Sequence, residues 1–214
     1  MRPAQLRCRC SAAWLAVRWQ VMASNESDVA LMQRIRDGDE EAFRELVERH
    51  QRAVINVIYR SIGDAWEAED LAQRVFVQVY RSAPRYKPTA KFTTWLFTIV
   101  HNAVLNEHRR RARHATESLE ALAQPENPAE ANVQVADSSA ADPAHEAAHR
   151  ELQERVKEAV GRLPDQQRTA VILCRYEGLS YEGIARVLQC SVSAVKSLLH
   201  RARLTLKDEL RGYY

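Results

Sequence analysis

The stretch GLSYEGIARVLQCSVSAVKSLLHRARLTLK, residues 178–207, decides the fold that this sequence predicts. Ser180 is placed to cap a helix, because its hydroxyl can accept a hydrogen bond from a free amide of the first turn. The apolar face of that helix carries Ile184, Ala185 and Leu188. The helical period then breaks at residues 189–192, and a second helix is predicted to begin near Ser193. Two short helices joined by a tight turn form a helix-turn-helix, whose second helix lies in the DNA major groove.

The second predicted helix has one apolar face and one polar, basic face. Its inward positions are Val195, Leu198, Leu199, Ala202 and Leu206. Its outward positions hold hydrogen-bond donors suited to guanine edges and phosphates, namely Ser193, Lys196, Ser197, His200, Arg201 and Arg203. The alternative interpretation is a solvated face on an ordinary helical hairpin. Periodicity alone does not separate the two, because no glycine marks the turn.

The composition favours an all-helical protein with one or two domains. The chain has 214 residues, of which 46% are hydrophobic and only 6 are glycine, and it lacks strand-like alternation. The net charge of +3 hides three blocks: residues 1–115 hold 19 Lys and Arg against 13 Asp and Glu, residues 116–149 hold 0 against 7, and residues 150–214 hold 12 against 8. Two basic modules separated by an acidic connector suggest that each module meets a polyanion.

The 4 cysteines show neither a metal-binding nor a disulfide pattern. Cys8, Cys10, Cys174 and Cys190 include no pair with CxxC spacing, and Cys174 and Cys190 are predicted to be small packed residues in a reducing compartment. No apolar run approaches the length needed to cross a membrane. We therefore expect no cofactor, no metal, no membrane insertion and a cytoplasmic location.

Residues 1–24 are predicted to form a disordered N-terminal tail. The apolar patch at residues 11–17 is cut off by Arg18 and no cleavage site follows, which argues against a secretory signal. Alternatively, translation begins at Met22 and the preceding residues are an upstream extension.

Residues 25–114 are predicted to form a first helical domain. Asp28 and Asp39 are placed to cap its first two helices, and a third helix is predicted at about residues 65–82. That third helix has a polar face with Glu67, Glu69, Asp70, Gln73 and Arg74. Taken alone, such a face is most simply an ordinary wetted surface.

A basic loop at residues 85–91 leads into a long helix, predicted at residues 93–113. Aromatic and polar or basic side chains cluster there: Arg85, Tyr86, Lys87, Lys91, Phe92, Trp95, Asn102, Arg109, Arg110, Arg111 and Arg113. Aromatic faces that stack on bases, mixed with cations that follow the backbone, are typical of single-strand binding sites. For Trp95, burial in the core is the competing interpretation, and its residue type favours burial.

Residues 115–146 are predicted to be a flexible acidic linker, because they lack apolar periodicity. Residues 147–210 are predicted to form a second, four-helix domain. Its first helix carries Leu152, Val156 and Val160 and ends at Gly161; the second begins near Pro164, and the helix-turn-helix completes the unit.

Several segments together resemble the sigma-70 family of bacterial sigma factors. DEEAF at residues 39–43, AEDLAQRVF at 68–76 and FTTWLFTIVHN at 92–102 resemble region two of that family. Residues 162–203 resemble its region four, and no third domain lies between them. This two-domain layout is similar to the extracytoplasmic-function subgroup.

The resemblance implies a function and three surfaces. Glu69, Asp70 and Gln73 would dock on core RNA polymerase, and the 85–91 loop with the start of the long helix would hold the melted −10 strand of promoter DNA. Asn102 and the basic cluster at residues 109–113 would face that strand and the upstream duplex, and the helix-turn-helix would read the −35 duplex. An anti-sigma factor is an expected partner by the same resemblance.

The sequence departs from the family pattern at named positions. Arg74 stands where an acid is usual, Asn106 replaces a common Asp, residues 193–194 replace a usual Gly-Thr, and Leu198 replaces a common Arg. These departures concern the promoter sequence that the protein would read more than its family.

Two other classes of function compete with this reading. A stand-alone repressor or activator would use only the helix-turn-helix, leaving the first domain without a role. A nuclease or other metal enzyme would need clustered acidic and His ligands, which the sequence does not display. We expect a protein that is not an enzyme.

Overall fold

The structure, a computed structural model, describes residues 27–119 and 143–211, with side chains described for residues 27–113 and 151–211. Within these residues the chain is helical and contains no strand, as the sequence predicts. The helices are α2 (Asp28–Arg36), α3 (Glu40–Ile62), α4 (Ala65–Ser82), α5 (Phe92–Leu119), α6 (Pro143–Gly161), α7 (Asp165–Arg175), α8 (Tyr181–Val187) and α9 (Val192–Glu209), with a 3-10 turn η1 (Ala83–Arg85). The predicted tail and most of the predicted linker lie outside the described residues.

Side-chain caps explain where the first helices begin. Asp39 accepts hydrogen bonds from the amides of residues 41 and 42, at 3.0 and 3.1 Å, and Asp64 caps α4 at 2.9 Å. A hydrogen bond from Arg34 is the main cause of a lowered pKa at Asp39. The predicted cap of α2 is wrong, because Ser27 caps that helix and Asp28 instead accepts from Arg49 at 2.7 Å.

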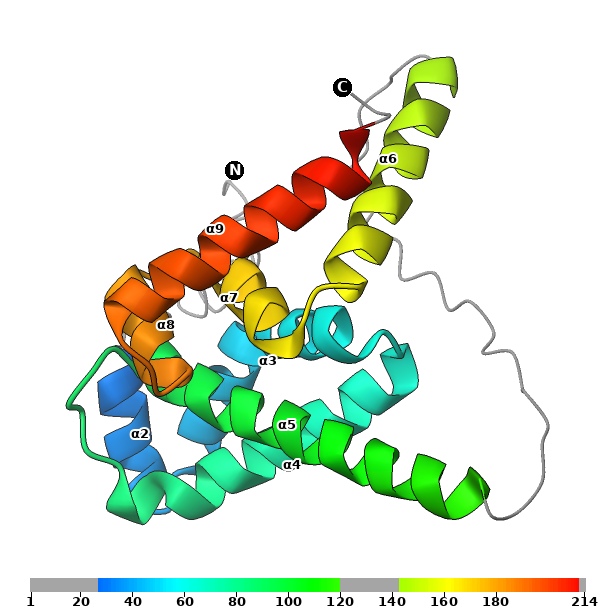
Figure 1. Ribbon diagram of the computed structural model, residues 1–214. Coiled ribbons are helices and arrows are strands. Elements are labelled where there is room, and N and C mark those ends of the chain that lie inside the picture. The colour runs from blue at the N-terminus through cyan, green and yellow to red at the C-terminus, as the bar shows by residue number, and fades with distance from the viewer. Residues whose placement is uncertain (1–26, 120–142, 212–214) are drawn as a thin grey trace, which may run out of the picture.

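Helices α2 to α5 pack into a first bundle (Figure 1). Each of these helices buries apolar side chains in it. Helix α3 packs against α2, α4 and α5. The fully buried side chains at these contacts include Leu31, Leu46, Ile58, Val75 and Leu96. Burying each large aliphatic side chain contributes about 1.5–3 kcal/mol. The buried faces of the helices therefore fix which polar side chains of the first bundle point to solvent.

Two helices extend into the predicted linker. Helix α5 continues to residue 119 and α6 begins at residue 143, whereas the sequence places the linker at residues 115–146. No Gly or Pro interrupts residues 114–119, and Pro143 fits the first turn of a helix, where its missing N–H is not needed.

The second bundle contains the predicted helix-turn-helix, formed by α8 and α9. Ser180 caps α8 through the amide of Gly183 at 3.2 Å, and Ser191 caps α9 through the amide of Ala194 at 3.1 Å. Between them Gln189 adopts a left-handed conformation, with φ of 53°. Glycine is the usual residue in this region, so the turn forms without the residue that normally reveals it.

Replacing Ser191 with alanine should lower the free energy of unfolding by about 1 kcal/mol, because α9 loses its N-terminal cap. Ser197→Ala in the interior of the same helix is the matched control, since its hydroxyl only bonds a helical carbonyl. Urea denaturation of both variants measures the difference. Equal stability of the two variants would show that the cap contributes nothing.

The two bundles pack against each other along a seam, which the sequence did not predict. Helices α6 and α7 contact α3, and α8 contacts α5 (Figure 1). Buried hydrophobic residues of both bundles form one continuous cluster.

Candidate nucleic-acid interface

Helix α9 presents its polar face to solvent. All the predicted contact residues are exposed: Ser193, Lys196, Ser197, His200, Arg201 and Arg203. The opposite face is buried through Val195, Leu199 and Ala202, which are 0–4% exposed, while Leu198 and Leu206 are half-buried. The packing therefore fixes which side chains of α9 are available to a DNA groove.

Helix α8 supports α9 from its inner side. Ile184 and Val187 are fully buried, and α8 packs against both α7 and α9. At the start of α8, hydrogen bonds from its own amide and from Ser180 lower the pKa of Glu182, and the charge of Lys196 on α9 adds to that effect. The carboxylate of Glu182 therefore lies near enough to Lys196, a predicted DNA contact, for their charges to attract.

The basic loop and the start of α5 form the second predicted surface. Arg85, Lys87 and Lys91 are exposed. Tyr86 and Trp95 are half-buried and meet edge to face, with ring centroids 4.8 Å apart and planes at 64°. Burial raises the pKa of Tyr86, and Asp28 raises it further. Trp95 packs against the core, yet part of its surface stays accessible beside the loop cations.

The end of α5 carries the predicted basic cluster. Asn102, Arg109, Arg110 and Arg113 are exposed. Glu107, which the sequence analysis missed, is only 7% exposed and accepts hydrogen bonds from Arg110 at 2.7–3.1 Å. The spacing of three and four residues from Glu107 to Arg110 and Arg111 is the sequence signal for these pairs.

Arg111 links two helices. It pairs with Glu107 in its own helix at 3.5 Å and also with Glu67 on α4. Its guanidinium is therefore part of the packing between α4 and α5, in contrast to the exposed Arg109 and Arg113.

Glu107→Gln should lower the free energy of unfolding by about 1–2 kcal/mol at pH 7, because charge-assisted hydrogen bonds become neutral ones. The hydrogen bond from Arg110 lowers the pKa of Glu107 below its ordinary value of 4.5. Its contribution is therefore present above pH 4.5 and disappears as pH falls through the lowered pKa. Denaturant titrations of both proteins between pH 7 and pH 3 should converge. A constant difference at every pH would contradict this role.

Helix α4 presents the third predicted surface. Glu69, Asp70 and Gln73 are exposed, as the helical pattern predicts. Arg74 lies on the same face and pairs with Asp70 four residues earlier. The departure from the family pattern thus partly neutralises the acidic face.

Potential metal ligands do not cluster among the described residues. No group of three or more His, Cys, Asp or Glu side chains among them could hold a metal ion. No helix in the described ranges is both long and apolar enough to cross a membrane.

Comparisons with known proteins agree with the sequence pattern and the geometry. The sigma-70 region 2 family matches residues 46–114, and the sigma-70 region 4 family matches residues 153–206. The chain is 34% identical over 190 residues to the RNA polymerase sigma-H factor of Pseudomonas aeruginosa, covering 89% of this chain and 97% of that protein. It is 30% identical to the ECF RNA polymerase sigma-E factor of Haemophilus influenzae, with 89% and 98% covered.

A solved structure extends the similarity to three dimensions. CnrH, in complex with the cytosolic domain of CnrY, is 26% identical and superposes with a TM-score of 0.63, covering 88% of this chain and 100% of that one. The matches include both bundles and nearly the whole length of the relatives. The chain therefore belongs to the sigma-70 family, in its extracytoplasmic-function branch of RNA polymerase sigma factors.

Proposed function

We propose that this sigma factor binds core RNA polymerase and directs it to promoters by contacting two separate DNA elements. The observation that carries the proposal is the polar face of α9, held outward by a buried apolar face within a complete helix-turn-helix. In this assignment Lys196, Ser197, His200 and Arg201 face the bases of the −35 duplex, and Arg203 faces phosphate.

The region around the start of α5 would hold the −10 element as a melted strand. Its exposed cations, Arg85, Lys87 and Lys91, adjoin the half-buried pair Tyr86 and Trp95. Unstacking a base costs a few kcal/mol, so a surface that captures unstacked bases favours opening of the duplex. The exposed arginines at the end of α5 would contact the strand and the upstream backbone.

The exposed face of α4 would dock on the polymerase through Glu69, Asp70 and Gln73. The acidic charge of this face suits a basic partner surface. Because Arg74 pairs with Asp70, the contact with the polymerase would be weaker or differently shaped than that of an all-acidic face. The protein supplies binding energy and positions the polymerase, without catalytic chemistry of its own. We assign it to the cytoplasm, and we propose an anti-sigma factor as a further partner by family similarity.

Run-off transcription with purified core polymerase and a promoter library tests this function. We expect new transcripts that require the added chain. The competing repressor or activator function predicts tight duplex binding by the free chain and no new transcripts. Absence of transcripts with active core and a folded chain would refute the proposed function.

A further inference from the structure

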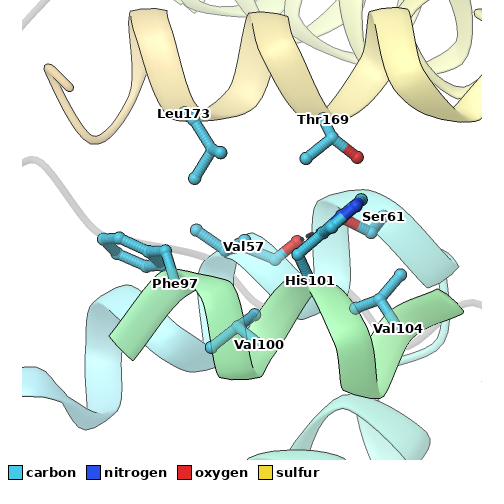
Figure 2. A pocket seen from close by; sticks show the side chains of 8 residues that line it. All are labelled: Val57, Ser61, Phe97, Val100, His101, Val104, Thr169 and Leu173. Carbon is cyan, nitrogen blue, oxygen red and sulfur yellow. Dashed lines mark hydrogen bonds between the residues drawn. The ribbon is translucent and has the colours of Figure 1, made fainter. Parts of the chain in front are cut away.

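A small cavity lies in the seam between the two bundles. It is lined by Val57 and Ser61 of α3, by Phe97, Val100, His101 and Val104 of α5, and by Thr169 and Leu173 of α7 (Figure 2). Its volume is about 10 Å³, which is room for about one water molecule and far too little for a metabolite. The cavity is therefore a packing feature of the seam and not a ligand site.

Polar contacts also join the two bundles across the seam. The guanidinium of Arg168 on α7 donates to the carbonyls of Ser61 at 2.9 Å and Gly161 at 2.7 Å, so it joins the ends of α3 and α6. Lys157 on α6 donates to the hydroxyl of Tyr59 on α3 at 2.6 Å. The guanidinium of Arg60 lies 3.8 Å from the ring centroid of Tyr176, beyond the end of α7.

The same seam brings the helix-turn-helix against the start of α5. Arg186 of α8 reaches the carbonyl of Thr89, in the basic loop, at 3.5 Å. Gly183 lies so near α5 that an added Cβ would be 3.4 Å from Oγ1 of Thr94. Elements centred 35 and 10 base pairs upstream are separated by roughly 85 Å at 3.4 Å per base pair. If the proposed function holds, the two bundles must part before both elements are bound.

Buried polar atoms of His101 and of α7 make no hydrogen bond to another described residue. Nδ1 of His101, Oε1 of Gln167 and Nε of Arg168 are buried and have no hydrogen-bond partner in the described part of the chain. Figure 2 shows His101 projecting from α5 toward α7, between Ser61 and Thr169. A charged imidazole in this position would be desolvated among mainly apolar neighbours.

We propose that this seam is a closed state of the free chain, held by contacts of α3 and α5 with α6, α7 and α8, and that protonation of His101 opens it. This inference concerns the chain alone. Its test does not require polymerase or DNA, so it can succeed or fail separately from the proposed function.

The direction of the pH dependence follows from burial. Burial lowers the pKa of His101 below its ordinary value of 6.5, and the charge of Asp165 on α7 acts in the opposite direction. The closed state is therefore favoured above pH 6.5 and loses stability as pH falls through the lowered pKa. Between pH 7.5 and pH 5.5 this linkage raises the ratio of open to closed chains by at most about tenfold.

Other charged groups in the seam modify this response. Asp165 also lies 3.5 Å from Arg168, which offsets part of its attraction for a protonated His101. Arg60 on α3 and Arg186 on α8 also place positive charge at the seam, at Tyr176 and Thr89 respectively. Burial raises the pKa of Glu177, and the charge of Arg60 acts in the opposite direction. Protonation of the Glu177 carboxyl at low pH therefore favours the closed state, whereas protonation of His101 favours the open state. Replacing His101 alone separates its contribution to the pH dependence from the contributions of these other charged groups.

Small-angle X-ray scattering of the full chain at pH 7.5 and pH 5.5 tests the proposal, with circular dichroism to verify that the helices persist. We expect the radius of gyration to increase at pH 5.5 in the natural chain. His101→Leu and His101→Gln remove the charge and should keep the chain compact at both pH values. Two variants are used because leucine and glutamine differ in polarity, so if one of them fails to fold in the cavity the other still tests the proposal.

His108→Leu is the matched control, because this half-buried histidine lies on α5 but does not line the cavity. It should open at pH 5.5 like the natural chain. Equal expansion of the two His101 variants at pH 5.5 would overturn the proposal, and so would a natural chain that stays folded and compact at that pH.

Discussion

Replacing Lys196 and Arg201 together with alanine should lower promoter-directed transcription by about 100-fold or more while polymerase binding stays intact. Both side chains are exposed on α9, and each contact with a base edge contributes about 1–3 kcal/mol. Two such contacts at about 1.5 kcal/mol each correspond to a loss of somewhat more than 100-fold. The buried face of α9 is untouched, so the fold should persist.

The matched control for this double variant is Lys207→Ala with Arg211→Ala. It removes the same charge from exposed positions near the other end of α9. Affinity for the promoter and for core polymerase should be measured separately, at several salt concentrations, because phosphate contacts depend strongly on salt. Loss of polymerase binding in the Lys196 and Arg201 variant would contradict the division of labour between the two bundles.

Replacing Asp70 with arginine should weaken the association with core polymerase by about tenfold or more. The change removes the pair with Arg74 and places two positive charges four residues apart on the exposed face of α4. A like-charge contact at an interface costs several kcal/mol against a basic partner surface, although exposure and salt reduce this penalty. The substitution lies outside the buried side of the helix.

Glu48→Arg makes the same change of charge at an exposed position on α3 and serves as the control. Titration of labelled core polymerase with each variant gives the two dissociation constants. If Asp70→Arg binds as tightly as the natural chain, the polymerase docks on a different face.

Much of the fold was predictable because its causes are local. Asp39 and Ser180 are residue types that cap helices, and both do so in the structure. The apolar spacing of residues 195, 199 and 202 alone selects the buried side of α9 and hence its exposed donors. The family resemblance then supplied what periodicity left open, namely the choice between a helix-turn-helix and an ordinary hairpin.

The features that sequence reasoning missed depend on distant contacts or on unusual backbone. Ser27 and Asp28 are both capping types, and only the long-range pair of Asp28 with Arg49 distinguishes their roles. Gln189 forms the turn in a conformation that its residue type does not reveal. The seam required knowledge of how two bundles meet, so the place of His101 between α5 and α7 cannot be read from its own helix.

The central claim is that the two bundles hold two separated stretches of promoter DNA while bound to the polymerase. Footprinting of the complete polymerase complex, combined with chemical detection of unpaired thymines, tests it most directly. The account predicts two protected segments roughly 85 Å apart along the duplex, with unpaired bases only in the downstream one. A single protected segment, or strand opening under the segment bound by α9, would contradict the account.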